Sequence, residues 1–339
     1  MQSSVSKIRE KIFSNDNFNF EEIALQLFDF QYTHNLVYKQ FVDYLKINAA
    51  EVQTVQQIPF LPIEFFKTHR ILTENAETQK IFESSGTTGQ ITSKHLVADL
   101  ALYEESFDKG FQQFYGKIED FTILALLPSY LERDTSSLVY MVDDLIKKTK
   151  NEHSGFYLNN LEELAVKIKY LKSQIASEIS EHKSKILLIG VTFALLDFAE
   201  QFPMDLSDVI IMETGGMKGR REELTREEVH AILNSAFNVK TIHSEYGMTE
   251  LLSQGYSKGS GIFEVPKWMK ILKRDIYDPM NVSGTPGRGG LNVIDLANIY
   301  SCAFIATQDL VNIKSESEFE VLGRLDNSDI RGCNLMVAM

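Results

Sequence analysis

Short apolar runs that end in turns alternate with longer amphipathic segments along the middle of the chain, and this alternation restricts the fold more than any other feature. The runs "FTILALLP" (121–128), "KILLIGVTF" (185–193) and "DVIIMETGG" (208–216) have the length and continuous apolar character of buried strands. Between them, "SSLVYMVDDLIKKT", "NLEELAVKIKYLKSQI" and "TREEVHAILNSAF" are typical of helices, the last with Thr225 and Glu228 at capping-box spacing. Strands that alternate with helices predict an α/β fold with mostly parallel sheets flanked by helices.

The two ends of the chain differ from this middle part. The first 60 residues carry helical periodicity, whereas a strand-rich tail follows the Gly/Pro-rich "SGTPGRGG" after residue 280. We therefore expect a helical N-terminal segment over 1–80, packed on an α/β core over 81–280, and a strand-rich C-terminal part over 281–339.

Composition and charge exclude several classes of protein. The formal net charge is −13, with 47 acidic against 34 basic residues, which argues against a nucleic-acid partner. The longest apolar run, "ILLIGVTFALL" (186–196), is too short for a membrane span, which needs about 20 residues. The first residues lack the apolar segment of a signal peptide, and Cys302 and Cys333 cannot form a disulfide framework. We expect a cytoplasmic protein.

The loop in "FESSGTTGQITSK" (82–94) concentrates small hydroxyl residues and glycines. We expect it to lie between the strand "QKIFE" and a helix, where α/β proteins often bind phosphate. Backbone N–H groups, hydroxyls and one ammonium could all face an anion here; the residues are Ser84, Ser85, Gly86, Thr87, Thr88, Gly89 and Lys94. The spacing is not that of a Walker loop, and composition alone leaves a plain turn open.

Further polar motifs follow the predicted strands. "HSEYGMTE" (243–250), after the predicted strand "NVKTI", offers a ring to stack on a base, a hydroxyl for a phosphate and a carboxylate for Mg²⁺. "ATQDLV" (306–311) and "LGRLDNSDIRG" (322–332) come later. The histidines form no metal-binding pattern, although His243 stays open as a site residue because it lies close to Tyr246. Cys302, in "IYSCAFIA", is expected in the core.

In their order and spacing these motifs resemble the adenylate-forming superfamily, which converts a carboxylate and ATP into an acyl-adenylate. The matching patterns are S-S-G-T-T-G-x…K, Y-G-x-T-E, T-G-D-L and G-R-x-D…I-x-G. Gln308 stands where the superfamily usually has glycine, and Lys94 lies further from the glycines than usual. "IPFLPIEFFKTH", "METGGMKGRRE" and "DIRGCNL" look most like the LuxE-type acyl-protein synthetases, the long-chain-fatty-acid–protein ligases, over nearly the full length.

The resemblance implies a role for each matching residue. Ser84 to Gly89 would hold the β- and γ-phosphates with the catalytic Lys94. Thr249 would contact the α-phosphate and Glu250 would bind Mg²⁺, both as catalytic residues. Tyr246 would lie against the adenine, with Gly247 and Met248 beside it. Asp309 would bind the ribose, with Arg324 in support. Gly215 and Gly216 would line the adenine and acyl crevice.

The implied reaction activates a fatty acid or other carboxylic acid with ATP and Mg²⁺ to acyl-AMP, and then transfers the acyl group to a thiol. Cys333 is the expected acceptor, and in an extended segment Arg331 would lie on its face and favour the thiolate. A partner reductase or carrier protein would then take the acyl group. The mobile C-terminal lid of full-size members, with its catalytic lysine, is expected to be absent. Two alternatives stay open: an acyl- or aryl-CoA ligase that uses coenzyme A, and a non-catalytic nucleotide-binding subunit.

Overall fold

The computed structural model describes residues 2–14, 18–85, 91–129, 131–177, 184–215 and 224–325. The chain forms two compact units. The first comprises Met1–Ser106, Thr249–Ser253 and Glu264–Met339, and the second comprises Phe107–Met248 and Gln254–Phe263. Residues 1–80 and 281–339 therefore belong to the same unit, while the three-part division at residues 80 and 280 stays a prediction.

The second unit contains the parallel sheet that the sequence predicts. Its strand order is β5 (Gly155–Phe156), β4 (Phe121–Leu126), β6 (Lys185–Gly190), β7 (Val209–Glu213) and β8 (His243–Tyr246), all parallel, followed by β9 (Gly255–Ser257), antiparallel to β8. The three predicted strands are confirmed. The apolar run that begins at Lys185 leaves the sheet after Gly190 because the helix α8 (Thr192–Gln201) begins almost at once.

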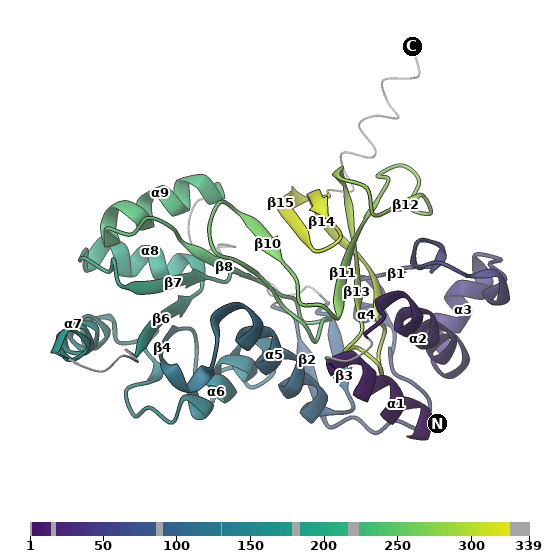
Figure 1. The fold of residues 1–339 in the computed structure, drawn as a ribbon, viewed down its shortest axis with the longest axis horizontal. Coiled ribbons are helices and arrows are strands. Elements are labelled where there is room, and N and C mark those ends of the chain that lie inside the picture. The colour runs from purple at the N-terminus through teal and green to yellow at the C-terminus, as the bar shows by residue number, and fades with distance from the viewer. Residues whose placement is uncertain are drawn as a thin grey trace, which may run out of the picture. The chain divides into compact units, whose positions relative to one another are not determined.

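Helices cover both faces of this parallel sheet (Figure 1). Alternate strand residues such as Leu124, Leu188 and Ile211 pack on α7 (Leu161–Ser177), α8 and α9 (Arg226–Phe237). The opposite face, with Ile123 and Leu187, meets α6 (Ser137–Thr149) and the second half of α5 (Leu100–Tyr115). The predicted capping box of α9 is present, since the Thr225 side chain accepts from Glu228 N.

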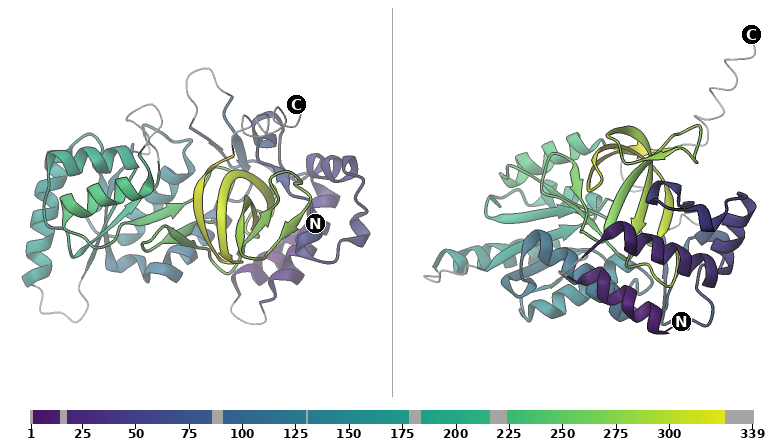
Figure 2. Two further views of the ribbon diagram at one scale, coloured as in Figure 1. Left: turned by 90° about the horizontal axis from the view of Figure 1, so that it is seen from above. Right: turned by 45° about the vertical axis from the view of Figure 1, so that its right-hand side comes forward.

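The first unit holds the strand-rich part of the chain. Here β12 (Val282–Ser283), β11 (Met269–Arg274), β13 (Gly287–Asp295), β14 (Phe304–Ser315) and β15 (Glu318–Arg324) pair antiparallel, while β1 (Leu61–Pro62) pairs parallel with β14. Register shifts interrupt the β14–β15 pair, and the yellow strands curl strongly in the view from above (Figure 2). The remaining short strand, β10, spans Ile262–Glu264.

The N-terminal helices α1 (Gln2–Phe13), α2 (Phe20–His34) and α3 (Leu36–Tyr44) also belong to the first unit. Two 3₁₀ turns, Ala49–Glu51 and Val55–Gln57, precede the short α4 (Phe65–Thr68), and a third spans Ile118–Asp120 in the second unit. The buried Gln31 side chain fixes α2, since it donates to Asn298 O and Ile299 O and accepts from Ala303 N. Tyr38 of α3 stacks on Phe304 of β14.

Two local predictions are wrong. The Ser/Thr/Gly loop connects β2 (Lys80–Glu83) to β3 (Lys94–Val97), an antiparallel hairpin, and not a strand to a helix. The residues "KHLV" pair with "KIFE", so the following helix starts only at Leu100. Similarly, the strand expected over 238–242 is β8 at His243–Tyr246, because Asn238 takes a left-handed conformation at the end of α9.

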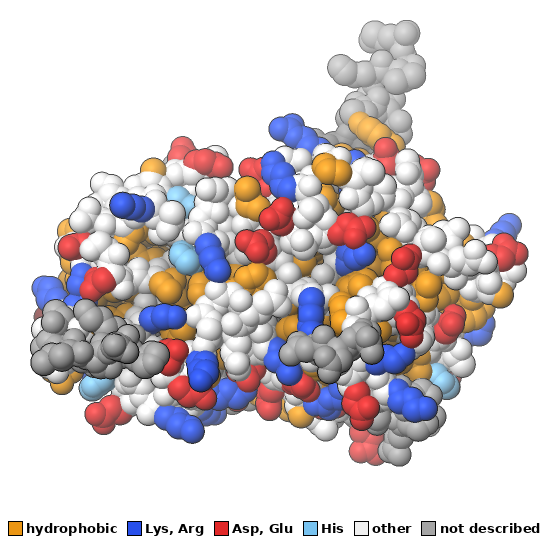
Figure 3. Space-filling model, viewed as in Figure 1, with side chains coloured by type: hydrophobic (Ala, Val, Ile, Leu, Met, Phe, Trp, Pro, Cys, Tyr) orange, Lys and Arg blue, Asp and Glu red, His pale blue; other side chains and the backbone are white. Residues whose placement is uncertain are grey.

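Acidic and basic side chains are interspersed over the visible face in Figure 3, as expected for a solvated surface with a formal net charge of −13. Within the described ranges, no helix is both long enough and apolar enough to cross a membrane.

Candidate functional site

The β2–β3 hairpin holds the described ends of the Ser/Thr/Gly loop. Ser84 N donates to Ser93 O over 3.1 Å, and the Ser84 hydroxyl accepts from Ser93 N over 2.9 Å. Directly beside this closure Lys94 Nζ lies 3.3 Å from Glu83 Oε1, its partner across the hairpin. The two hydrogen bonds of Ser84 thus hold the two described ends of the loop together. The ammonium of Lys94 already faces the carboxylate of Glu83.

His95 connects the hairpin to the "YGMTE" segment. Its ring is buried, with Nδ1 2.8 Å from Thr249 O and Nε2 3.1 Å from Asn298 Oδ1. Asn298 Nδ2 in turn donates to Glu250 O over 2.8 Å. Burial lowers the pKa of His95 to about 4 against the opposing effect of the two hydrogen bonds. The imidazole is therefore neutral and carries a single N–H, so it donates to only one of the two oxygens that face it, Thr249 O and Asn298 Oδ1. The ring still links β3 to the backbone of Thr249 and, through Asn298, to that of Glu250, the two predicted catalytic residues.

Asp295, at the end of β13, holds the residues that follow. Its carboxylate accepts from Leu252 N, Ser253 N and Ser253 Oγ at 2.8, 3.0 and 2.5 Å. The Ser253 hydroxyl also accepts from Trp268 Nε1 over 3.0 Å. The segment 249–253 has no regular structure, so these buried side chains replace the backbone pairing that a strand would supply.

Glu250 is a buried carboxyl with cations near it. Burial raises its pKa, while a hydrogen bond from Ser93 and the charges of Arg324 and Lys67 oppose the rise. Among the described residues no group of three or more possible metal ligands occurs. One protein carboxylate nevertheless fits Mg²⁺, which commonly binds one or two carboxylates together with substrate phosphates.

Asp309 and Arg324 form a cross-strand pair of β14 and β15. Arg324 Nε lies 3.5 Å from Asp309 Oδ1, and the arginine side chain is 62% exposed against 11% for the aspartate. Asp309 N also donates to Thr307 Oγ1 over 3.1 Å, which fixes the backbone at the aspartate. The structure thus brings these two predicted site residues together.

A partly buried arginine of β11 supports this strand. Arg274 donates to Leu291 O at 2.7 Å and to Asn292 Oδ1 at 3.0 Å, and it also bonds Thr307 O. Burial lowers the pKa of Arg274, and the charges of Glu64 and Asp309 oppose this. Gln308, at the position where the resemblance implies glycine, donates to Glu64 Oε1.

In the second unit, polar groups gather at the carboxyl ends of the parallel strands, where α/β sheets usually bind ligands. Glu213 ends β7, and its Oε2 accepts from Thr192 Oγ1 at 3.0 Å and from Gly215 N at 2.9 Å. His230 Nε2 lies 3.8 Å from the other carboxylate oxygen. Burial acts to raise the pKa of Glu213, but the surrounding His230, Ser244, Gly215 and Thr192 outweigh it and lower the pKa to about 2. Gly215 has φ +73°, a conformation that favours glycine.

The neighbouring strand β8 carries Glu245, a carboxyl whose pKa is raised where that of Glu213 is lowered. Burial, and then the negative charge of Glu213, raise the pKa of Glu245 to about 8, so this carboxyl is protonated at neutral pH. Tyr115 OH lies 3.1 Å from His243 Nδ1, and burial together with the charge of Lys258 lowers the pKa of His243. His243 therefore lies in a buried polar cluster, and its role in the site stays a prediction.

Tyr246 ends β8, and Gly247 follows it. Tyr246 is buried and packs edge-on against Phe263, with ring centroids 5.7 Å apart. A Cβ on Gly247 would lie 2.3 Å from Glu245 Oε1, so a larger residue here would require the Glu245 side chain to move. The chain passes from the second unit to the first between Met248 and Thr249.

Several predicted residues lie outside the described part of the chain: Gly86, Thr87, Thr88, Gly89, Gly216 and Cys333. Ser85 is described and exposed. Cys302 is fully buried, and burial raises the pKa of its thiol to about 12, which fits the predicted core position.

Sequence reasoning missed His95, Glu245 and Arg274. Each is a single polar residue whose partners lie far away along the chain, so no spacing pattern marks it. A weak signal existed for Glu245, since it stands inside "HSEYGMTE".

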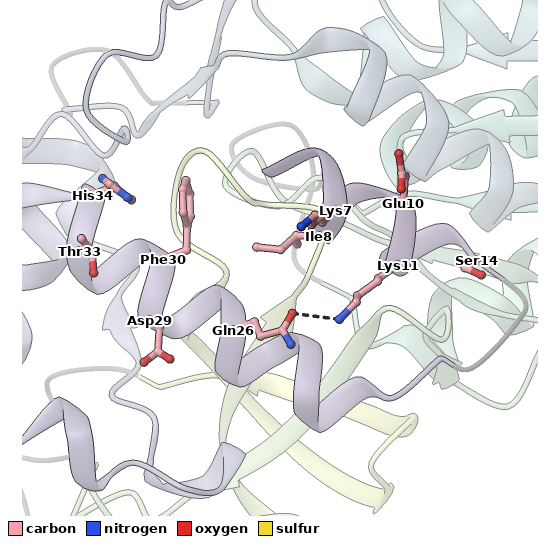
Figure 4. Close-up of a pocket in the computed structure, with 10 residues that line it drawn as sticks. All are labelled: Lys7, Ile8, Glu10, Lys11, Ser14, Gln26, Asp29, Phe30, Thr33 and His34. Carbon is pink, nitrogen blue, oxygen red and sulfur yellow. Dashed lines mark hydrogen bonds between the residues drawn. The ribbon is translucent and has the colours of Figure 1, made fainter. Parts of the chain in front are cut away.

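An open depression of about 780 Å³ lies over α1 and α2 (Figure 4). Charges of both signs line it, and Lys11 donates to Gln26 there. None of the predicted site residues lines this depression.

The comparisons with known proteins agree with the motif resemblance. A model of the family described as acyl-protein synthetase, LuxE, matches residues 5–339. A search of curated proteins gives no significant match.

Solved structures share the fold at low identity. ATP-bound MatB from Rhodopseudomonas palustris is 13% identical, with a TM-score of 0.52, over 74% of this chain and 48% of that one. A structure of 2-hydroxyisobutyryl-CoA ligase with 2-HIB-AMP and CoA is 11% identical, with a TM-score of 0.60, over 96% of this chain and 69% of that one. The chain thus spans about half the length of MatB. These similarities confirm the predicted fold class, and the chain belongs to the LuxE family of acyl-protein synthetases.

Proposed function

We propose that this chain uses ATP to activate a fatty acid or other carboxylic acid as an acyl-adenylate, and that a cysteine thiol then takes the acyl group. Membership in the LuxE family supports acyl activation, and the similar structures were solved with ATP or with an acyl-adenylate. A cytoplasmic location, and hand-over to a reductase or carrier protein, belong to the same proposal.

One observation carries the proposal. His95 joins the strand that leaves the Ser/Thr/Gly loop to the backbone of Thr249 and, through Asn298, of Glu250. Two motifs separated by about 150 residues are thereby held in one unit by buried hydrogen bonds. A plain surface turn would not need this connection, whereas it supports a site that holds phosphate donors beside a carboxylate.

In the proposed first half-reaction, the substrate carboxylate attacks the α-phosphorus of ATP and pyrophosphate leaves. Ser84 and Ser85 with the loop would hold the β- and γ-phosphates, and Thr249 would donate to the α-phosphate. Glu250 would hold Mg²⁺, which when bound neutralises charge that moves onto pyrophosphate. Asp309 would accept from the ribose hydroxyls, and Arg324, whose Nε lies 3.5 Å from Asp309 Oδ1, would help to orient its carboxylate.

The motif resemblance assigns the adenine and acyl contacts to residues of the second unit. Tyr246 would stack on the adenine, with Gly247 and Met248 beside it, and Gly215 would line the crevice. The fixed charge of Glu213 holds the backbone at Gly215 in place through its hydrogen bond to Gly215 N.

In the second half-reaction, a thiolate attacks the acyl carbonyl carbon. A C–S bond forms, the bond to the phosphate oxygen breaks, and AMP leaves with the electron pair, while the thiol proton goes to solvent. Cys333 is the proposed acceptor. Cys302 cannot serve, because a fully buried thiol with a pKa of about 12 is neither ionised nor accessible.

Incubation with ATP, Mg²⁺ and radiolabelled fatty acids tests this acceptor. We expect covalent label on the wild type and on Cys302→Ala, and none on Cys333→Ser. Equal labelling of Cys333→Ser would contradict transfer to that thiol.

The similarity to a CoA ligase solved with CoA supports a second candidate, in which coenzyme A accepts the acyl group. CoA-dependent release of AMP that survives Cys333→Ser would select this candidate. A non-catalytic nucleotide-binding subunit remains the third alternative, and acid-dependent exchange of pyrophosphate into ATP would exclude it.

A further inference from the structure

Asp309 lies in an irregular stretch of β14. Gly290 and Asn292 of β13 pair with Leu310 and Ala306 of β14. The single residue of β13 between them therefore faces three residues of β14, the last of which is Asp309, and the register shifts here. Such a bulge interrupts the ladder of backbone hydrogen bonds and redirects side chains. The N–H and carbonyl groups at the bulge consequently need other partners.

The guanidinium of Arg274 pairs with two carbonyl groups at this bulge. Its Nη1 donates to Leu291 O over 2.7 Å, and its Nη2 donates to Thr307 O. The Thr307 hydroxyl donates to the same Leu291 oxygen over 3.0 Å and accepts from Asp309 N over 3.1 Å. A chain of hydrogen bonds therefore leads from the guanidinium to the backbone of Asp309.

Arg274 can cross β13 because the residue opposite it is a glycine. Arg274 of β11 and Gly290 of β13 face each other in the antiparallel pair. A Cβ on Gly290 would lie 2.7 Å from Cζ and 2.9 Å from Nε of Arg274, so even a methyl group would displace the guanidinium. Asn292 Oδ1 accepts from Nη1 over 3.0 Å and fixes the guanidinium further. The arginine side chain therefore reaches β14 over the backbone of Gly290.

We propose that Arg274 is a positioning residue of the candidate nucleotide site, which fixes the β14 bulge so that the Asp309 carboxylate faces the ribose hydroxyls of ATP. A guanidinium suits this role because its planar fork donates to several fixed acceptors at once. Arg324 contacts the Asp309 carboxylate from β15, whereas Arg274 acts on the backbone of Asp309 through Thr307. All these residues belong to the first unit. The inference rests on the proposed function, in which Asp309 accepts from the ribose hydroxyls.

Isothermal titration of the full chain with ATP, dideoxy-ATP and inorganic tripolyphosphate, without a carboxylic acid, tests the inference. Dideoxy-ATP lacks both ribose hydroxyls, so the ratio of its dissociation constant to that of ATP measures ribose recognition. Arg274→Met removes the guanidinium, Gly290→Ala displaces it, and Arg274→Lys keeps a single ammonium. Lys273→Met is the matched control, because this lysine lies on the same strand and donates to Pro286 O at the surface. Asp309→Ala gives the value without ribose recognition.

We expect a ratio of about ten or more in the wild type, as for one charge-assisted hydrogen bond, and of about one in Asp309→Ala. The ratio should fall about threefold or more in Arg274→Met and in Gly290→Ala, because a displaced carboxylate makes a weaker hydrogen bond. It should recover in part in Arg274→Lys and keep the wild-type value in Lys273→Met. The affinity for tripolyphosphate should be the same in every variant, whereas a general loss of folded protein would lower it.

A wild-type ratio in Arg274→Met, or a loss of tripolyphosphate binding as large as the loss of ATP binding, would overturn the inference and leave the proposed function intact. If Arg274→Met does not fold, the ratio in Gly290→Ala decides in the same way. A ratio near one in the wild type, or an unchanged ratio in Asp309→Ala, would overturn the proposed ribose contact of Asp309 and the inference with it.

Discussion

His95 Nδ1 lies 2.8 Å from the carbonyl oxygen of Thr249, although 154 positions separate the two residues in the chain. Because the ring is buried and its other nitrogen faces Asn298, this contact fixes the β3 strand and the segment 249–250 to one another. The contact holds two motifs from distant parts of the sequence together within the first unit.

Loss of this imidazole should reduce both stability and turnover. In His95→Ala the Thr249 carbonyl and the Asn298 amide lose a buried partner and a cavity forms, so we expect a free energy of unfolding lower by about 2–4 kcal/mol. Turnover should fall about tenfold or more, since Thr249 and Glu250 would no longer be held in place. Urea unfolding and acid-dependent pyrophosphate release measure the two effects.

His95→Asn is the matched control, because an asparagine amide can donate from near the Nδ1 position. It should recover a substantial part of the turnover lost in His95→Ala. If both variants turn over like the wild type, the contact has no positioning role.

Glu245→Gln should stabilise the protein at alkaline pH. The folded-state pKa of Glu245 is about 8, above the ordinary value of 4.5, so between these two pH values the folded state holds a proton that the unfolded state releases. Wild-type stability therefore falls as pH rises from 4.5 to 8, whereas an amide does not titrate.

The free energy of unfolding of Glu245→Gln should be close to that of the wild type near pH 4.5. At pH 8 it should exceed the wild-type value by about 2–4 kcal/mol, after allowance for partial exposure of the side chain. Urea unfolding at pH 5 and pH 8 measures the difference between variant and wild type. An advantage that stays constant across this range would contradict the raised pKa.

Asp295→Ala should destabilise the first unit strongly. Leu252 N, Ser253 N and the Ser253 hydroxyl would each lose a buried acceptor, and each unpaired buried group costs about 1–3 kcal/mol. We expect the free energy of unfolding to fall by about 3 kcal/mol or more. The exposed Asp278→Ala is the control and should change it by less than about 1 kcal/mol.

The sequence predicts the elements whose periodicity is long and regular. The strands at Phe121, Lys185 and Val209 and the capped helix at Arg226 are recognisable because apolar spacing and caps are local properties. The β2–β3 hairpin escapes this reasoning because "KHLV" is too short to distinguish a strand from the start of a helix. Its pairing depends on "KIFE" across the loop.

The candidate site likewise contains residues that the sequence motifs identify and residues that only the structure reveals. Asp309 and Arg324 could be identified from motif order, and the structure pairs them across β14 and β15. The buried contacts of His95 and the raised pKa of Glu245 depend on burial and on neighbours that are remote in sequence, which no motif encodes. Lys94 shows the converse, since its position in the motif does not reveal that Glu83 lies opposite.

The most direct test of acyl activation is the exchange of labelled pyrophosphate into ATP by the purified full chain, with a panel of fatty and other carboxylic acids. We expect exchange only when Mg²⁺ and an acid are both present, and a rate reduced about a hundredfold in Glu250→Gln and Asp309→Ala if their electrostatic contacts act in the transition state. Acid-independent exchange, or none with any acid in a folded protein that binds ATP, would contradict the account.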